Sequence, residues 1–130
     1  GPTFMEIPKI PDGEYRFADL VWESEPINST ALIKTAQERL GWKKATSYTV
    51  LRKLCEKGIL KNENATVTAI VKKDEVCRQE SEQLIHRSFG NSLPAFVAAF
   101  LRDKKLTRQE AEELKRLIDA ASMSDGRNDS

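Results

Sequence analysis

The chain has 130 residues, of which 39% are hydrophobic and 32% charged, and its formal net charge is +1. This length suffices for one ordinary domain, or for two very small domains that depend on a partner, and the composition favours a small, mostly helical protein. No apolar run reaches the length of about eighteen residues that a membrane span needs, and no secretory signal is recognisable, so we expect no membrane insertion. Cys55 and Cys77 suggest neither a disulfide framework nor a metal cluster, and we expect a cytoplasmic protein without cofactors. The start at Gly1-Pro2 resembles a tag-cleavage scar and is left out of the fold prediction.

The net charge conceals an uneven distribution along the chain. Residues 34–61 contain eight basic and two acidic side chains, whereas residues 1–33 contain two basic and six acidic ones. A concentrated positive segment is typical of a phosphate-binding surface. A helix with a solvated lysine and arginine face gives the same count, so charge alone leaves both interpretations open.

Three helices are predicted in the first half of the chain. The first begins with Asp12 as its N-cap and ends before Pro26. The second begins at a capping residue among residues 28–30 and ends at Gly41. The third is expected over about residues 45–57, where apolar residues recur at helical spacing.

The spacing of apolar residues changes after the third helix. Residues 59–61 and 65–71 are predicted as two short strands around a turn at residues 62–64, because the second run is rich in β-branched side chains. Three helices followed by a hairpin is the order of a winged helix-turn-helix, whose third helix enters the major groove of DNA. The basic segment coincides with the second and third helices, so two independent patterns predict a DNA-binding domain over residues 8–73.

The rest of the chain is predicted to be helical again. We expect a second domain over residues 74–121 and a flexible tail over residues 122–130. Its helices are predicted over residues 75–89, over residues 93–102, and from a capping box that begins at Thr107.

The helix over residues 93–102 is apolar on nearly every side and needs a partner. It packs either inward against the winged domain or between two subunits, and we favour a homodimer, because two recognition helices then read two half-sites about one helical turn apart. The residues expected at the dimer interface are apolar side chains of the last three helices: Leu84, Leu93, Phe96, Val97, Phe100, Leu114, Leu117 and Ile118.

Three stretches resemble the penicillinase-repressor (BlaI/MecI) family, and the similarity spans about residues 8–121. They are Trp22 with Glu23-Ser24, then WKKATSYTVLRKLCEKGIL at residues 42–60, and SLPAFVAAF at residues 92–100 followed by LTRQEAEELKRLID. The resemblance implies a mainly α fold with a small β-hairpin wing, built from an N-terminal winged helix-turn-helix and a C-terminal three-helix dimerisation domain. It also implies a cytosolic dimeric repressor that binds a palindromic double-stranded DNA operator and controls an operon of the β-lactam-resistance type or a related one.

The resemblance places base-reading residues at the start of the third helix. The family's Thr-x-x-Thr pattern falls on Thr46 and Thr49, and its variable base-reading position falls on Tyr48. A threonine hydroxyl can bind a phosphate or a base edge, and its methyl group can pack on a thymine methyl. Tyr48 has an alternative interpretation, as an aromatic side chain packed partly inside the fold. The family often has a basic residue where this chain has Ala45, which leaves the operator sequence open. The nearby cations are expected to be mostly phosphate contacts or solvated charge rather than base readers: Lys43, Lys44, Arg52, Lys53 and Lys57.

The family is released from its operator when a membrane sensor metalloprotease leads to its cleavage. The matching bond is Ala99–Phe100, although penicillinase repressors carry Asn where this chain has Ala99. Cutting this helix would remove buried contacts worth about 1.5–3 kcal/mol each. If the dimer dissociates as a result, the avidity of binding two half-sites is lost as well. The Cys-x-Cys motifs of a copper-responsive branch are missing from the sequence, so no metal sensing is expected.

The sequence does not predict an enzyme. His86 is the only histidine, so no histidine-dependent triad or zinc-binding pair can form within one chain. The carboxylates of the last helix are expected to be solvated or paired with Lys115 and Arg116: Glu110, Glu112, Glu113 and Asp119. Two alternatives to the proteolysed repressor stay open, a protein-interaction module with an incidental basic segment and a DNA-binding regulator released by a small-molecule effector.

Overall fold

The computed structural model describes the backbone of residues 6–129 and the side chains of residues 6–122. Gly1-Pro2, interpreted above as a scar, lies outside this range. The chain divides into two compact units, Gly1–Leu84 and Ile85–Ser130, so the boundary falls inside helix α4 (Lys73–Phe89), whereas we expected it between residues 73 and 74. The reason is Val76, which is 2% exposed in the core of the first unit and keeps the first turns of α4 there.

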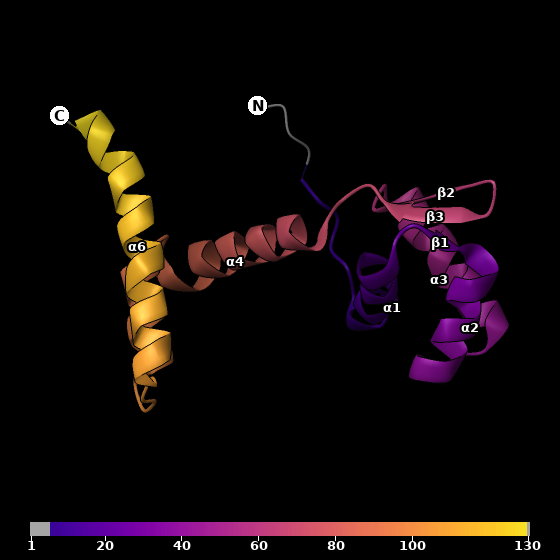
Figure 1. The fold of residues 1–130 in the computed structure, drawn as a ribbon, viewed down its shortest axis with the longest axis horizontal. Helices are drawn as coiled ribbons and strands as arrows, with labels where there is room; N and C mark the ends of the chain where they lie inside the picture. Colours follow the sequence, from indigo (N-terminus) through magenta and orange to yellow (C-terminus); the bar gives the residue numbers. More distant parts are fainter. Residues whose placement is uncertain (1–5, 130) are drawn as a thin grey trace. The chain divides into compact units, whose positions relative to one another are not determined.

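The first helix, α1 (Asp12–Ser24), ends where the sequence predicted but begins differently (Figure 1). Its N-cap is Pro11, so the prediction that Asp12 caps the helix is wrong. Asp12 is instead the first helical residue, where a carboxylate stabilises the positive end of the helix dipole. Glu25 is extended, because the residue before a proline is disfavoured in the helical region.

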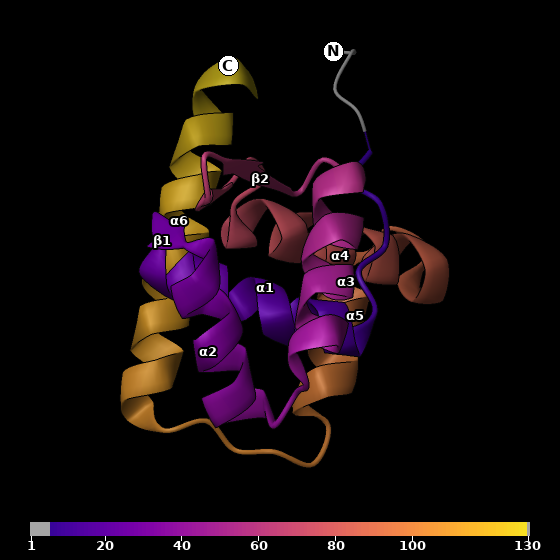
Figure 2. The ribbon, with the colours of Figure 1, turned by 90° about the vertical axis from the view of Figure 1, so that its right-hand side faces the viewer.

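The next two helices, α2 (Ser29–Leu40) and α3 (Lys44–Glu56), contact each other and α1 (Figure 2). The Asn28 side chain caps α2 by accepting hydrogen bonds from the backbone N–H groups of Thr30, at 2.8 Å, and Ala31, at 3.2 Å. Gly41, with φ of 71°, ends α2 in the left-handed region, as predicted.

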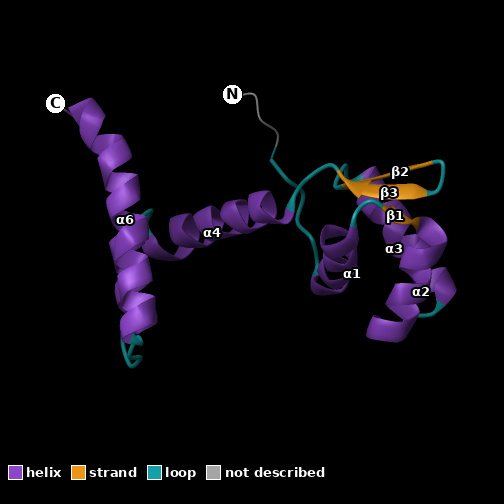
Figure 3. Cartoon of the chain, in the orientation of Figure 1, coloured by secondary structure: helices purple, strands orange, loops and turns teal. Residues whose placement is uncertain are grey.

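The sheet contains three antiparallel strands in the order β1-β3-β2 (Figure 3). Strands β2 (Leu60–Glu63) and β3 (Thr66–Ala69) form the predicted hairpin, but its turn is Asn64-Ala65 rather than residues 62–64. Both turn residues have positive φ, which a tight two-residue hairpin of type I′ requires. Strand β1 (Ile27–Asn28) was not predicted, because two residues cannot show a period.

The core of the first unit lies between the three helices and one face of the sheet. Phe17 is fully buried and stacks on Trp42, with ring centroids 5.7 Å apart. The other large and fully buried apolar side chains come from α1, α2, α3 and the sheet region: Val21, Leu32, Leu54, Ile59, Leu60 and Val67. This packing fixes α3, which carries the predicted base-reading residues.

The second unit contains α5 (Leu93–Leu101) and α6 (Arg108–Asp129). The predicted break is confirmed, since Gly90 and Asn91 both have positive φ. The capping box is confirmed too: the Thr107 backbone N–H donates to Glu110 Oε1 at 3.1 Å, and the Glu110 N–H donates to Thr107 Oγ1 at 3.0 Å. The backbone of α6 continues past Ala121, where we expected the tail to begin, and the side chains of residues 123–130 lie outside the described part of the chain.

Candidate nucleic-acid interface

Helix α3 has one face buried in the core and one face exposed to solvent. Ser47, Leu51 and Leu54 face the core. Tyr48, from the turn between them, is 42% exposed, so it is not the internal packing aromatic of the alternative interpretation. Of the two threonines of the Thr-x-x-Thr pattern, Thr46 is exposed and Thr49 is half-buried.

The basic side chains of residues 34–61 fall into two groups. Arg39, Lys57 and Lys61 form ion pairs with Glu23, Glu14 and Glu63, at 2.7, 2.6 and 3.4 Å. The second group consists of exposed cations that have no ion-pair partner within the described residues: Lys34, Lys43, Lys44, Arg52 and Lys53. Apart from Lys34, this second group belongs to the set of cations predicted as phosphate contacts or solvated charge. Lys57 was predicted in the same set, but it pairs with Glu14 instead.

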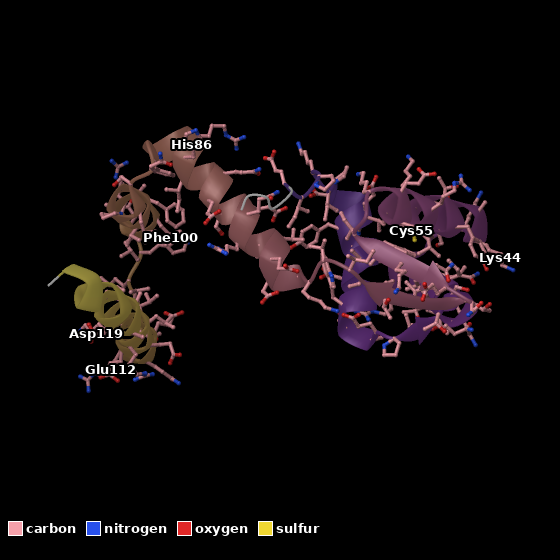
Figure 4. All side chains as sticks on the ribbon, turned by 90° about the horizontal axis from the view of Figure 1, so that it is seen from above. Lys44, Cys55, His86, Phe100, Glu112 and Asp119 are labelled. Atoms are coloured by element: carbon pink, nitrogen blue, oxygen red, sulfur yellow. The ribbon has the colours of Figure 1, made fainter. Side chains whose placement is uncertain are left out.

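The amino end of α3 adds to this positive charge. Its N-cap residue, Lys43, makes no side-chain capping hydrogen bond, and the first turn contains no acidic residue. The first backbone N–H groups of a helix have no acceptor within the helix, and together with the helix dipole they favour an anion. Figure 4 labels Lys44 at this end of α3. Helix geometry and side-chain charge therefore point to the same kind of ligand.

A hollow of about 360 Å³ connects α3 with the hairpin. It is lined by Tyr48, Leu51, Arg52, Cys55 and Asn62. Burial raises the pKa of the Cys55 thiol, and nearby Glu56 raises it further, so this sulfur stays protonated at neutral pH. We did not single out Asn62 from the sequence, because its place beside α3 depends on the register of the hairpin.

The second unit exposes much of its apolar surface. Within the described residues, α5 has no buried side chain. Phe96 is half-buried and lies between Phe89 and Phe100, with ring centroids 5.5 and 6.2 Å away. The other residues predicted for dimerisation are all exposed: Leu84, Leu93, Val97, Phe100, Leu114, Leu117 and Ile118. Phe100, Leu106 and Leu114 also line a hollow of about 470 Å³ between α5 and α6.

His86 and the carboxylates of α6 either make ordinary hydrogen bonds and ion pairs or are exposed. The His86 ring shares a hydrogen bond of 3.0 Å with Asn91 Oδ1. On α6, Glu110 belongs to the capping box and Glu113 pairs with Arg116, while Glu112 and Asp119 are exposed (Figure 4). No group of residues that could hold a metal ion occurs in the described part of the chain. In the same range, no helix is both long and apolar enough to cross a membrane.

The Ala99–Phe100 bond, which matches the cleavage point of the family, lies within α5. Both side chains are exposed in the single chain. Proteases cut exposed loop segments most readily, whereas this bond lies in an intact helix.

Comparison with known proteins connects these features to one family. The family model described as "Penicillinase repressor" matches residues 10–120. The penicillinase repressor of Bacillus licheniformis is 25% identical over 118 residues, which cover 88% of this chain and 92% of that protein. The methicillin resistance regulatory protein MecI of Staphylococcus epidermidis is 20% identical over 114 residues, covering 85% of this chain and 93% of that protein.

Two solved structures are similar to just over half of the chain. The solution structure of the DNA-binding domain of the repressor BlaI is 26% identical, covers 55% of this chain and 93% of that chain, and has a TM-score of 0.48. Monomeric Bacillus licheniformis BlaI, in complex with the blaP half-operator, is 27% identical, covers 54% of this chain and 90% of that chain, and has a TM-score of 0.47. Since the family model covers most of the sequence, the chain belongs to the penicillinase repressor family, whose members are DNA-binding transcriptional repressors and not enzymes.

Proposed function

We propose that this repressor acts as a homodimer on a palindromic DNA operator, with α3 in the major groove. The observation that supports the proposal is the exposed face of α3, where Tyr48 lies among cations that have no ion-pair partner within the described residues. Because the operator DNA of bacteria lies in the cytoplasm, the proposal places the protein there.

The residues of this face are assigned two roles. Thr46, Tyr48 and Thr49 are proposed to read base edges, because hydroxyl groups and apolar side-chain surface can distinguish bases in the major groove. The flanking cations are proposed to bind phosphates and to fix the register of the protein on the duplex: Lys43, Lys44, Arg52 and Lys53. The hairpin, next to the hollow that contains Asn62, is proposed to contact the adjacent DNA backbone.

The second unit is proposed to hold two subunits together. Its exposed leucine, isoleucine and phenylalanine side chains form more apolar surface than a short helical unit normally leaves in water. A second copy of the same unit would bury these side chains, and a dimer presents one α3 to each half-site of a palindrome.

Induction is proposed to follow the family pattern, through a membrane sensor metalloprotease that leads to cleavage between Ala99 and Phe100. A cut inside α5 would separate Phe100 and the proposed interface residues of α6 from the rest of the chain. The regulated genes are proposed to be a β-lactam-resistance-type or related operon. Co-expression with the sensor protein tests this route: a fragment ending at Ala99 supports it, and release of DNA by an intact chain bound to a small molecule contradicts it.

Selection of duplexes from a random library, followed by binding assays over a range of salt concentrations, tests the central proposal. Four phosphate-binding cations per subunit make eight per dimer, which predicts a slope of about −7 for the logarithm of the association constant against the logarithm of salt. Enrichment of a palindrome with a slope of this order supports the repressor. Weak and salt-independent DNA binding would instead favour a protein-interaction module.

A further inference from the structure

The N-terminal arm, residues 6–10, contacts two helices of the first unit. Only Ile10 is buried, at 6% exposed, and Ile7 is half-buried. Polar side chains from α4 and from the end of α3 bind the rest of the arm, mostly through its main chain. Such side chains hold the arm in a defined place although it has no regular secondary structure.

On the α4 side, Gln79 forms a closed pair of hydrogen bonds with one residue of the arm. The Ile7 backbone N–H donates to Gln79 Oε1 at 2.9 Å, and Gln79 Nε2 donates to the Ile7 carbonyl at 2.8 Å. One turn later, Gln83 Nε2 donates to Glu6 Oε2 at 3.1 Å. The paired amide of Gln79 satisfies both polar groups of one peptide residue, as a neighbouring strand does in a sheet.

At the other end, Lys57 binds the arm from the residue that follows α3. Its Nζ donates to the Lys9 carbonyl at 3.2 Å and pairs with Glu14 Oε1 of α1 at 2.6 Å. The side chains of Lys57 and Glu14 are only 29% and 14% exposed. Although Lys57 belongs to the basic segment, its ammonium group makes its contacts within the protein.

The contacts on α4 follow one face of the helix. Lys73 pairs with Asp19 of α1 at 2.8 Å, Val76 is in the core, and Gln79 and Gln83 bind the arm. Intervals of three and four residues place these side chains on one face of a helix. The last of them comes directly before Leu84, where the first unit ends.

We infer that residues 6–10 act as a strap that joins the end of α3 to the first turns of α4, and that Gln79 and Lys57 are positioning residues that set the direction in which α4 leaves the winged domain. The inference rests on the proposed function, since in a dimeric repressor this direction determines the separation of the two α3 helices. From Gln79 to Phe89 the helix rises about 15 Å, so a tilt of about 20° moves its end by roughly 5 Å. That displacement exceeds the rise of about 3.4 Å per base pair. The strap therefore selects the spacing between half-sites.

The test uses the full chain and a series of duplexes in which two selected half-sites are separated by spacers that grow in one-base-pair steps. The wild-type chain is expected to bind best at one spacing. Gln79→Ala is expected to lower the affinity at that spacing about two- to tenfold, as the loss of one or two net hydrogen bonds predicts, and to flatten the dependence on spacing. Its affinity for a duplex with a single half-site stays unchanged. The matched control is Glu80→Gln at the next position, an exposed residue without a side-chain hydrogen bond in the described structure, and it keeps the wild-type profile.

Two further variants keep the inference testable if Gln79→Ala does not fold. Gln79→Glu keeps the acceptor for the Ile7 N–H but loses the donor, and is expected to give an intermediate profile. Lys57→Gln releases the other end of the strap and flattens the profile while leaving the salt slope unchanged. A slope shallower by about 0.9 per lysine would make Lys57 a phosphate contact and overturn its positioning role.

Failure of the inference is distinguishable from failure of the proposed function. An unchanged spacing profile in Gln79→Ala, or a wild-type chain that tolerates every spacing equally, overturns the strap and leaves DNA binding intact. A wild-type chain that selects no DNA overturns the repressor proposal and the strap with it.

Discussion

Replacing Leu117 by alanine tests the proposed dimer directly. Leu117 lies on α6 and is 60% exposed in the single chain, so its replacement by alanine removes few contacts within its own unit. Phe96 is a poorer probe, because it packs against Phe89 and Phe100 and its loss would disturb the fold of the second unit. We expect Leu117→Ala to weaken dimerisation while the monomer stays folded.

The size of the effect follows from the exposed fraction. Complete burial of a leucine contributes about 1.5–3 kcal/mol, and roughly 60% of that, about 1–2 kcal/mol, remains to be gained when a partner covers Leu117. A symmetric dimer contains the side chain twice, which gives about 2–4 kcal/mol. At about 1.4 kcal/mol per tenfold change, the dissociation constant of the dimer should rise roughly 30- to 700-fold.

Sedimentation over a wide range of protein concentrations measures this constant for the wild-type chain and the variant. The matched control is Glu112→Ala, an exposed change on the same helix, which is expected to leave the constant within about twofold because surface substitutions outside an interface have small effects. Equal dissociation constants for Leu117→Ala and the wild type would refute the assignment of α6 to the interface. An unchanged helix content of the full chain in circular dichroism shows that the second unit of the variant stays folded.

Further predictions concern α3 and the two thiols. Tyr48→Ala should lose discrimination between operator and random DNA, whereas Lys53→Ala should weaken binding to both about equally, with a salt slope shallower by about 2 per dimer. If competition assays show that Tyr48→Ala loses affinity equally for both DNAs, Tyr48 does not read bases. Ser47→Ala should leave the stability unchanged or raise it by about 1 kcal/mol, because the fully buried Ser47 hydroxyl has no hydrogen-bond partner among the described residues. A loss of more than about 1 kcal/mol in thermal unfolding would contradict this. Ser81→Ala, a change at an exposed serine of α4, is the control. Cys77 should react with a maleimide faster than Cys55 at pH 7, since Cys77 is exposed while burial raises the pKa of Cys55. Raising the pH should increase the reaction rate at Cys55. Mass spectrometry of the labelled peptides measures both rates.

The parts of the fold that depend on local chemistry could be predicted from the sequence. The ends of α2, the break at Gly90-Asn91 and the capping box at Thr107 all depend on residues within a few positions of each other. The start of α1 was harder, because both Pro11 and Asp12 favour a helix start, and the prediction chose the wrong one.

Features that depend on distant residues could not be predicted in the same way. Strand β1 exists because Ile27 and Asn28 pair with β3, about forty positions further along the chain. Val76 follows a polar stretch and looks like the first apolar residue of a separate domain, yet it packs into the winged-helix core. Gln79 gives no sequence signal at all, since its partner is the backbone of Ile7, and backbone groups look alike in every sequence.

The ion pairs explain how a chain of net charge +1 can present a positive surface. In the described structure, three acidic side chains of α1 and its C-cap, Glu25, bind cations outside the exposed face of α3, namely Lys57, Lys73, Arg39 and Lys72. Apart from the half-buried pair of Lys57 and Glu14, these ion pairs involve exposed side chains, and an exposed pair adds generally less than about 1 kcal/mol, so stability alone is a weak reason for this arrangement. Its electrostatic effect is larger, because every neutralised cation removes a site where DNA of any sequence could bind. Apart from Lys34, the cations of residues 34–61 that have no ion-pair partner in the described structure therefore lie on α3 and at its N-terminus. The proposed DNA-binding face thus keeps its positive charge although the chain as a whole is nearly neutral.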